Sequence, residues 1–381
     1  MTRDATDVDT TLGAGERERD EALVREALSL SHEALGRTSP NPPVGAVVLD
    51  PSGTVVGRGW TQPVGGEHAE TVALAEAGER ARGGTVAVTL EPCRHTGRTP
   101  PCTDALLAAG VAIVVVACTD PTAAAGGGAE VLRGAGVTVR TGVLADEVAR
   151  GPLEAWLGAQ STGRPFVTWK YAASLDGRSA AADGTSRWIT SAAARADVHR
   201  LRSEVDAVVA GVGTVLADDP LLDVRRDPAP LVQPLRVVVD THARTPTTAR
   251  CLSGPVPALV VTGPLVDPPG YLDTASLPLG AHGRVALEAL LALLAGRGVV
   301  SVLLEGGPTL AGSFVAAGLV GRVVGYVAPA LLGAGPAALA AAGVGTIGQA
   351  HRLRLDDATC IGEDVRLTLR PPRSEPDPRS E

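Results

Sequence analysis

The sequence is nearly without lysine and asparagine. Lys170 is the only lysine among 381 residues, against 33 arginines, and Asn41 is the only asparagine. Lysine carries a compact point charge that the planar arginine fork does not reproduce, and asparagine presents a donor and an acceptor together. We therefore interpret Lys170 and Asn41 as candidate site residues, at positions where no substitute works. The alternative for each residue is that it is present by chance and has no functional role.

Other absences exclude whole classes of protein. The net charge is −8, which opposes a nucleic-acid binder that depends on neutralising phosphates. No apolar run approaches the length that spans a bilayer, and the polar first ten residues are unlike a signal peptide. The five cysteines do not suggest a disulfide framework, which indicates a reducing compartment. We expect a cytoplasmic protein with no nucleic-acid or membrane partner.

The sequence does contain a set of metal-ligating residues. His68-Ala69-Glu70 is followed by Cys93, which comes directly after a proline, and then by Cys102. One imidazole and two thiolates supply three of the four ligands that Zn²⁺ takes, and catalytic zinc sites leave the fourth position to water. Such water ionises near neutral pH, and Glu70 is placed to move its proton. The pattern is typical of zinc-dependent base deaminases.

The spacing of the two cysteines departs from that pattern. Eight residues, 94–101, separate them, where base deaminases have two. This insert holds three potential cations, among them Arg98, so we interpret it as a grip for a phosphorylated substrate. The alternative is a closed structural zinc site whose fourth ligand is Cys118, Cys251 or Cys360. None of these three lies at ligand spacing from the first two cysteines.

The first part of the chain alternates strands and helices. Residues 1–19 are polar and without periodicity, which predicts disorder, and 20–36 predict an amphipathic helix. The other predicted elements are a hairpin over 44–60, a helix over 68–83, a strand over 85–90, a helix over 102–109, and strands over 111–117 and 137–141. This alternation implies a three-layer α/β sheet. His68 and Glu70 can then share a site only in an irregular first helical turn, because positions two apart splay by about 200° on an ideal helix.

The pattern loosens after residue 145 and resumes near 164. We place a connector at 150–163, a first domain at 20–150 and a second at 163–372. The second domain is predicted to contain strands over 166–172, 207–211, 235–240, 258–262 and 299–304, and helices over 190–205 and 285–295. Its last strand runs into Glu305-Gly306-Gly307-Pro308. Glycines allow close backbone approach there, and the free N–H groups of a following helix can hold phosphate.

These motifs together resemble the family of bifunctional riboflavin biosynthesis proteins, in which a pyrimidine deaminase is fused to a reductase. The resemblance covers about residues 20–370, and the eight-residue gap between the cysteines is characteristic of this family. The matching runs are 39–45, 68–70, 89–93, 97–102, 173–178, 187–190, 214–220 and 305–312.

The resemblance implies a cytidine-deaminase-like domain followed by a dihydrofolate-reductase-like domain. The first would deaminate 2,5-diamino-6-ribosylamino-4(3H)-pyrimidinone 5′-phosphate, and the second would reduce its ribosyl group with NADPH. By motif position, His68, Cys93 and Cys102 would bind zinc, and Glu70 would transfer the proton. The residues at NADP positions are Ala172, Trp188, Thr214, Asp218, Thr241, Gly307, Pro308, Thr309, Leu310, Ala311, Gly312 and Ser313.

The remaining assignments concern the substrates and partners. Asn41 falls near the deaminase substrate. The reductase substrate positions are Lys170, Ser186, Arg202, Leu222, Arg225 and Glu305. The two arginines would grip the ribose phosphate as bidentate donors, whereas core packing is the alternative for Ala172 and Leu222. We expect a small phosphorylated pyrimidine as substrate and other copies of the chain as partners in a homo-oligomer.

Two segments depart from the family, and two rival functions stay open. The segment 120–123 replaces a more proline-rich family run, which predicts a looser loop near the deaminase pocket. The segment 150–153 replaces the family's interdomain motif. The rivals are a nucleic-acid deaminase, such as a tRNA adenosine editor, and a protein in which one domain only binds a metabolite. The net negative charge argues against a nucleic-acid deaminase. The complete set of zinc ligands together with Glu70 argues against an inactive deaminase domain.

Overall fold

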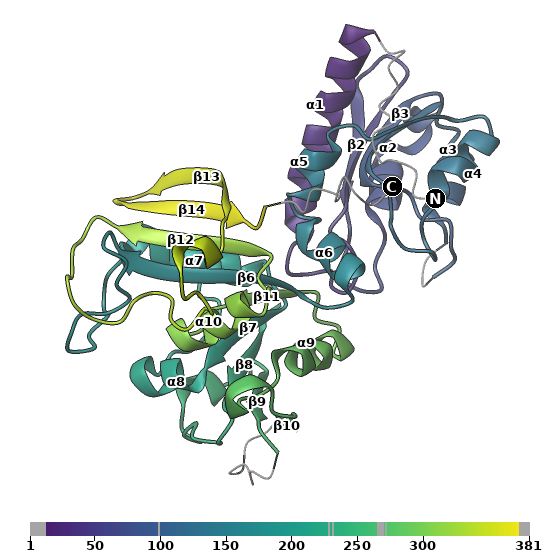
Figure 1. Cartoon of the computed structure of the whole chain (residues 1–381). Helices are drawn as coiled ribbons and strands as arrows, with labels where there is room; N and C mark the ends of the chain where they lie inside the picture. The colour runs from purple at the N-terminus through teal and green to yellow at the C-terminus, as the bar shows by residue number, and fades with distance from the viewer. Residues whose placement is uncertain are drawn as a thin grey trace. The chain divides into compact units, whose positions relative to one another are not determined.

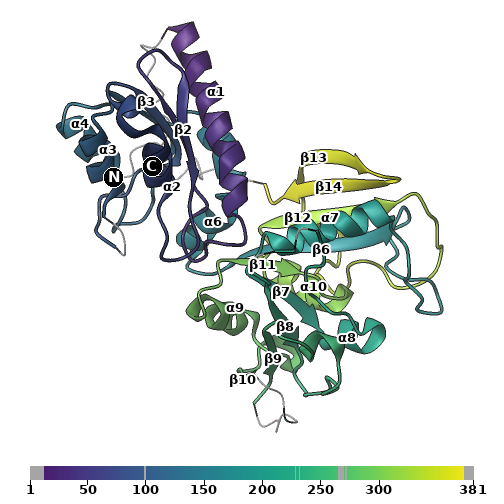
Figure 2. The same cartoon turned by 180° about the vertical axis from the view of Figure 1, so that it is seen from behind.

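The chain consists of two compact units, residues 1–164 and 165–381 (Figure 1, and from behind in Figure 2). This computed structural model describes residues 13–97, 100–227, 229–230, 232–264, 270 and 273–372. The first unit holds a five-stranded sheet and the second a nine-stranded sheet. Among the described residues, no helix has both the length and the apolar character needed to cross a membrane.

The sheet of the first unit mixes two strand directions. Its strand order is β2-β1-β3-β4-β5, with β1 antiparallel to β2 and β3, and with β3, β4 and β5 parallel. The elements are α1 Ala14–Ser31, η1 His32–Ala34, β1 Gly45–Leu49, β2 Val55–Trp60, α2 Ala69–Ala77, η2 Gly78–Ala81, β3 Thr85–Leu90, α3 Cys102–Ala109, β4 Ile113–Cys118, α4 Gly128–Gly134, β5 Thr138–Thr141, α5 Ala145–Ala149 and α6 Glu154–Thr162.

Glycines let helices pack closely on both faces of this sheet. A Cβ atom at Gly45 in β1 would lie 1.9 Å from the carbonyl oxygen of Ala27 in α1. A Cβ atom at Gly59 in β2 would lie 2.2 Å from the carbonyl oxygen of Ala69 in α2. Gly59 pairs with Ala46, and successive strand residues point to opposite faces. Helices α1 and α2 therefore cover opposite faces, which confirms the three predicted layers.

The first helix begins earlier than predicted. Helix α1 starts at Ala14, whereas the sequence predicts disorder through residue 19. Arg140 of β5 explains the difference, because it lies 2.9 Å from the Asp20 carboxylate and 3.0 Å from that of Glu16. Asp20 is buried, so this pairing ties the first turns of the helix to the sheet. Residues 1–12 of the predicted disordered segment lie outside the described residues.

The predicted connector is partly helical. Helix α6 occupies most of the segment 150–163, and the first unit extends to Arg164. Leu153 and Trp156 are both buried there. Most of the segment that we predict as a connector is therefore a helix of the first unit. Its glycine and proline residues mark the start of a helix that packs on the first unit.

The sheet of the second unit is parallel over most of its width. The order is β10-β9-β8-β7-β11-β6-β12-β14-β13, and only the pairs of β14 with its two neighbours are antiparallel. The elements are β6 Phe166–Ser174, α7 Ala192–Ser203, β7 Ala207–Gly211, α8 Val212–Asp218, β8 Leu235–Val239, η3 Arg250–Leu252, β9 Ala258–Thr262, β10 Thr274–Ser276, η4 Ala281–Gly283, α9 Leu287–Gly296, β11 Ser301–Leu304, α10 Pro308–Ala316, β12 Arg322–Ala328, η5 Ile347–Gln349, β13 Arg354–Ile361 and β14 Asp364–Arg370.

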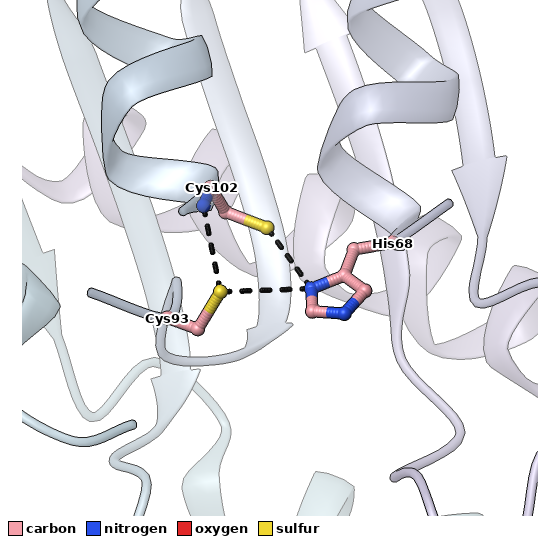
Figure 3. Close-up of side chains that lie close together, drawn as sticks. All are labelled: His68, Cys93 and Cys102. Carbon is pink, nitrogen blue, oxygen red and sulfur yellow. Dashed lines mark hydrogen bonds between the residues drawn. The ribbon is translucent and has the colours of Figure 1, made fainter. Parts of the chain in front are cut away.

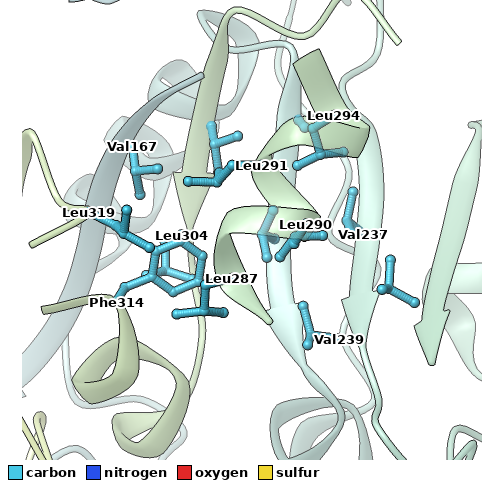
Figure 4. Packing of buried hydrophobic residues seen from close by; sticks show 14 of the residues in the cluster. Val167, Val237, Val239, Leu287, Leu290, Leu291, Leu294, Leu304, Phe314 and Leu319 are labelled. Carbon is cyan, nitrogen blue, oxygen red and sulfur yellow. The ribbon is translucent and has the colours of Figure 1, made fainter. Parts of the chain in front are cut away.

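This sheet is also covered on both faces. Val209 of β7 packs in one core cluster with α9 and α10, whereas Val208 packs in another with α7 and α8. Figure 4 shows the first cluster, where Leu290 and Leu294 of α9 lie against the strands. A parallel sheet buried on both faces gathers its ligand sites at the carboxyl ends of its strands. The functional residues of this unit should therefore meet at that edge.

The predicted strands of the second unit are confirmed, and several elements are additional. The strands at 207–211 and 258–262 coincide with β7 and β9. Helix α8 and strands β10, β12, β13 and β14 are not predicted. Strand β13 is almost entirely exposed, so it lacks the alternation of apolar residues that predicts a strand.

Candidate active sites

The first candidate site is a cluster of one histidine and two cysteines (Figure 3). His68 directly precedes α2, Cys93 follows β3, and Cys102 is the first residue of α3. The Nδ1 atom of His68 lies 3.2 Å from the Cys102 Sγ atom and 3.6 Å from the Cys93 Sγ atom. All three candidate ligand atoms lie within 4.8 Å of one another, and both cysteines are buried. The three residues meet as predicted, with His68 and Cys102 at the starts of helices and Cys93 in the loop after a strand.

These separations fit a zinc ion. Tetrahedral ligation, with Zn–N near 2.0 Å and Zn–S near 2.3 Å, separates nitrogen and sulfur ligands by about 3.5 Å. The backbone N–H of Cys102 donates to the Cys93 Sγ atom at 3.4 Å. Hydrogen bonds from Cys102 and His68 lower the pKa of Cys93 to about 4, although burial opposes this. The thiolate is the form that binds metal, so the cluster suits Zn²⁺ chemically as well as geometrically.

The alternative of a closed structural site lacks a fourth ligand. Within the described ranges, no further histidine, cysteine or carboxylate joins the three-residue cluster. Cys118 instead donates its thiol to the carbonyl oxygen of Ala145 at 3.5 Å. Cys251 and Cys360 belong to the second unit. Three ligands leave one position for water, as in a catalytic zinc site.

Glu70 lies beside this cluster at the start of α2. His68 keeps an extended backbone with φ −75° and ψ 160°, and Glu70 is the second residue of the helix. The irregular first turn predicted from the sequence is therefore present. Glu70 is only 4% exposed, and burial raises its pKa to about 7 despite the neighbouring His68. A carboxyl group that titrates near neutral pH can both accept and release a proton.

The loop that departs from the family is held firmly. The Glu91 carboxylate accepts hydrogen bonds from the backbone N–H of Asp120 at 3.1 Å and of Ala129 at 2.9 Å. Within the loop, the Thr122 hydroxyl donates to the Asp120 carboxylate at 2.6 Å. Ala125 packs against the two cysteines of the cluster. These hydrogen bonds of Glu91 and Thr122 restrain the loop backbone, and its looseness relative to the family stays a prediction.

The other residues predicted for this site lie in neighbouring loops. Asn41 precedes β1, and its backbone N–H donates to the carbonyl oxygen of Thr38 at 2.8 Å. Its contact with a substrate stays a prediction. In the insert between the cysteines, the Arg94 guanidinium donates to the carbonyl oxygen of Ala123 at 3.3 Å. Arg98 lies outside the described residues.

The second candidate site is a cavity of about 1640 Å³ in the second unit. It opens where β6, β7, β8 and β11 end, at the edge predicted from the strand directions. Pockets for one small ligand usually measure roughly 300–1,000 Å³. This cavity therefore has room for a dinucleotide cofactor and a second ligand beside it.

Most residues that the resemblance assigns to the reductase line this cavity. They are Lys170, Ala172, Ser186, Trp188, Arg202, Thr214, Asp218, Leu222, Arg225, Thr241, Glu305, Gly307, Pro308, Thr309, Leu310 and Ser313. Leu222 is only 2% exposed and also packs in the core, so both interpretations of this residue apply.

Ala311 and Gly312 do not line the cavity. Ala311 is fully buried in the core cluster of α9 and α10. A Cβ atom at Gly312 would lie 1.7 Å from the carbonyl oxygen of Ala340, so this residue faces a neighbouring segment. Their contact with the cofactor stays a prediction. The residues of α10 that do line the cavity are Pro308, Thr309, Leu310, Ser313 and Ala316.

Three charged side chains form a buried network in the cavity wall. Arg202 of α7 holds both oxygens of Glu305, from Nε at 2.5 Å and from Nη2 at 2.9 Å. The Nζ atom of Lys170 lies 3.7 Å from Glu305 Oε2. Burial opposes ionisation of Glu305, yet the charges of Arg202 and Lys170 lower its pKa to about 2. Burial lowers the pKa of Lys170, and Glu305 opposes this.

This network bears on the interpretation of the two arginines. The guanidinium fork of Arg202 is engaged by Glu305 in the structure, and its grip on phosphate stays a prediction. Arg225 differs, because its side chain is about half exposed and its only ion pair among the described residues is with Asp223. Of the two arginines, Arg225 is the one suited to bind an anion from solution.

Another part of the cavity wall has features that fit a dinucleotide. Helix α10 begins with Pro308 directly after Gly307, so its first N–H groups have no partners within the helix. The ring of Trp188 is 69% exposed at the cavity, and the Arg195 guanidinium lies 4.2 Å from its centroid. A large exposed aromatic surface beside free N–H groups suits a ligand with both rings and phosphates. NADPH has this chemistry.

Arg195 and His199 are among the residues of the cavity wall that sequence reasoning missed. Both lie on α7 with Arg202. His199 stands three positions before Arg202, a spacing that places two side chains on one helix face. This spacing is the signal that could have identified it.

Both units match known families. Residues 17–118 match the family described as the cytidine and deoxycytidylate deaminase zinc-binding region, and residues 165–367 match the RibD C-terminal domain. Riboflavin biosynthesis protein RibD of Mycobacterium tuberculosis (strain ATCC 25618 / H37Rv) is 48% identical over 345 residues, which cover 90% of this chain and 95% of that protein. RibD of Escherichia coli (strain K12) is 39% identical over 366 residues, with 92% and 99% covered.

Solved structures agree with these sequence matches. Acinetobacter baumannii RibD, form 1, has a TM-score of 0.83 at 38% identity, covering 94% of this chain and all of that one. A Thermotoga maritima protein has a TM-score of 0.84 at 32% identity with the same coverage. It is described as a diaminohydroxyphosphoribosylaminopyrimidine deaminase/5-amino-6-(5-phosphoribosylamino)uracil reductase. The expected fold class, a cytidine-deaminase-like unit followed by a reductase unit, is confirmed, and the chain belongs to the RibD family of riboflavin biosynthesis proteins.

Proposed function

We propose that this chain catalyses two consecutive reactions of riboflavin biosynthesis. The first is hydrolytic deamination of 2,5-diamino-6-ribosylamino-4(3H)-pyrimidinone 5′-phosphate. The second is NADPH-dependent reduction of the ribosyl group, which gives 5-amino-6-ribitylaminouracil 5′-phosphate. The observation that carries this proposal is the presence in one chain of a three-ligand His-Cys-Cys cluster and of a separate cavity large enough for two ligands.

In the deaminase unit, His68, Cys93 and Cys102 would hold zinc. Bound zinc supplies Lewis-acid chemistry that makes water nucleophilic at neutral pH. The Glu70 carboxylate takes a proton from the attacking water and delivers it to the departing amino nitrogen. One water is consumed and one ammonia is released. Burial of Glu70 next to the cluster supports this role, because a general acid and base must lie within reach of both atoms.

In the reductase unit, the residues separate into two groups along the cavity. The exposed N–H groups at the start of α10, with Thr214, Thr241 and Trp188, would bind NADPH, which supplies the hydride. Lys170 and Glu305 face the substrate at the other side and orient it for hydride transfer. Their network is charged and ordered before any ligand binds, as electrostatic preorganisation requires.

The proposal also covers the binding partners of the enzyme and its cellular compartment. Its partners are a small phosphorylated pyrimidine and further copies of the same chain in a homo-oligomer, without nucleic acid or membrane. The cysteine usage supports a reducing compartment, the cytoplasm.

The test supplies the purified chain with the diaminopyrimidinone phosphate, with and without NADPH. Mass spectrometry should find the deaminated intermediate alone when NADPH is absent and the ribityl product when NADPH is present. Intermediate that accumulates although NADPH is present would contradict the second reaction. Unchanged substrate in both arms would contradict the first reaction.

A further inference from the structure

A short loop presents Arg225 to the cavity and is held in place at several backbone atoms. The side chain of Gln233 accepts from the Val224 N–H at 2.8 Å and donates to the Val224 carbonyl oxygen at 2.9 Å. Arg202 of α7 donates from Nη1 to the carbonyl oxygen of Asp223 at 2.9 Å. Loops restrained in this way can hold a side chain in one orientation before a ligand arrives.

The last of these restraints comes from His199. Its Nδ1 atom accepts a hydrogen bond from the backbone N–H of Arg225 at 3.1 Å. Only the neutral imidazole with its hydrogen on Nε2 can accept at Nδ1. Burial and the charges of Arg202 and Arg225 lower the pKa of His199, which favours this neutral form at neutral pH. His199 therefore fixes the backbone of the residue whose side chain is suited to an anion.

Helix α7 thereby connects the two ends of the substrate site. Arg202 binds Glu305, which also pairs with Lys170, whereas His199 on the same helix holds Arg225. The distance between the charged network and Arg225 is thus set by one rigid element. A substrate that carries a phosphate at one end and its reacting carbon at the other needs such a fixed distance.

We propose that His199 is a positioning residue that holds Arg225 toward the phosphate of the reductase substrate and so makes the enzyme prefer phosphorylated over dephosphorylated substrate. This inference rests on the proposed function of the second unit. His199 acts through Arg225 and not on the reacting atoms. Its loss should affect the recognition of phosphate while the binding of NADPH is kept.

The experiment compares reduction of the deaminated intermediate with reduction of the same compound after enzymatic removal of its 5′-phosphate. The preference is the ratio of the two kcat/KM values. His199→Leu should lower this ratio by about tenfold, the effect of weakening one hydrogen bond to a charged group. His199→Asn should keep the ratio near that of the wild type, because the asparagine Oδ1 atom lies at the same distance along the side chain as Nδ1 and can still accept the Arg225 N–H.

Two further variants separate positioning from a general structural role. Arg225→Ala should abolish most of the preference, and adding His199→Leu to Arg225→Ala should not lower the ratio further. His351→Leu is the matched control, because this exposed histidine of the same unit bonds only to the carbonyl oxygen of Ala342 in the structure. NADPH affinity and deamination, measured on every variant, report whether the chain has folded.

The outcomes are distinguishable. A wild-type enzyme that reduces neither compound overturns the proposed reductase function. A wild-type enzyme that reduces both equally well, or a His199→Leu variant with the wild-type ratio, overturns only the role of His199. Equal loss in the Asn and Leu variants, or equal loss for both compounds, also overturns it, since a positioning role through Arg225 predicts neither.

Discussion

The two sites of this chain are built in different ways. The deaminase site gathers three ligand atoms within 4.8 Å of one another, each at or just before the start of a helix or after a strand. The reductase site is a cavity of about 1640 Å³, lined by residues from Lys170 to Ala341. The first site is defined by the few atoms that a metal needs. The second is defined by the shape and charge of a surface.

The two sites also differ in what fixes their charges. The cysteines of the first site lie ready for a cation, and the state of their thiols depends on each other and on His68. In the second site, Glu305 already has two cationic partners, and these hold its pKa at about 2. A small metal cluster should therefore fail completely when one ligand is lost. A distributed network should lose function by degrees.

The largest expected effect is that of His68→Ala. Without the imidazole only two ligands are left, so the variant should lose zinc and deamination together. Reduction of the deaminated intermediate should continue at the wild-type rate, because His68 belongs to the first unit alone. Metal analysis and separate assays of the two reactions check this. If deamination is retained without zinc, the first site does not depend on its metal cluster, and the contrast with the distributed network of the second site does not hold.

Glu70→Gln should give the next largest effect. The amide has nearly the same shape but cannot carry the proton, so deamination should fall by roughly 10²–10⁴-fold while zinc stays bound. Measured zinc content separates this result from that of His68→Ala. Near-normal deamination would remove Glu70 from the mechanism.

Fragments of the chain test whether the two units are independent. A fragment of residues 1–164 should bind zinc and deaminate, and 165–381 should reduce the intermediate with NADPH. A shorter fragment, 1–155, loses α6 with its buried Trp156. It should be less stable than 1–164 by about 3 kcal/mol, because removal of a large buried side chain costs about that much. Denaturant titration of both fragments measures the difference, and activity that returns only on mixing the two halves would contradict independent sites.

Lys170→Arg should have the smallest effect. Arg202 already occupies both oxygens of Glu305, and a larger guanidinium must fit where Lys170 now lies 3.7 Å from the carboxylate. Reduction should fall by about tenfold, equivalent to about 1.4 kcal/mol, with NADPH affinity and deamination unchanged. Steady-state kinetics with both substrates check this. If the variant reduces the substrate at the wild-type rate, the inference from the rarity of lysine to a role for Lys170 is wrong.

Much of the first site could be predicted because its geometry is local. Zinc chemistry fixes the residue types, and the start of a helix fixes where His68, Glu70 and Cys102 point. The strands of both units were predictable from buried apolar runs such as those of β7 and β9. Helix α6 was not, because the burial of Trp156 depends on the packing of the unit and not on a strong local pattern.

What the sequence by itself determined is the chemistry available: one imidazole, two thiolates and a carboxylate next to the ends of strands and the starts of helices, and a glycine turn before a helix in the second unit. What only the tertiary structure decided is which charged groups meet. Glu305 and Arg202 are 103 residues apart, and Arg225 and His199 are 26 apart. The folding of β11, α7 and the loop at 221–225 onto one edge of the sheet brings them together. Local sequence patterns do not encode such contacts, because packing across the whole sheet sets the distances between these side chains.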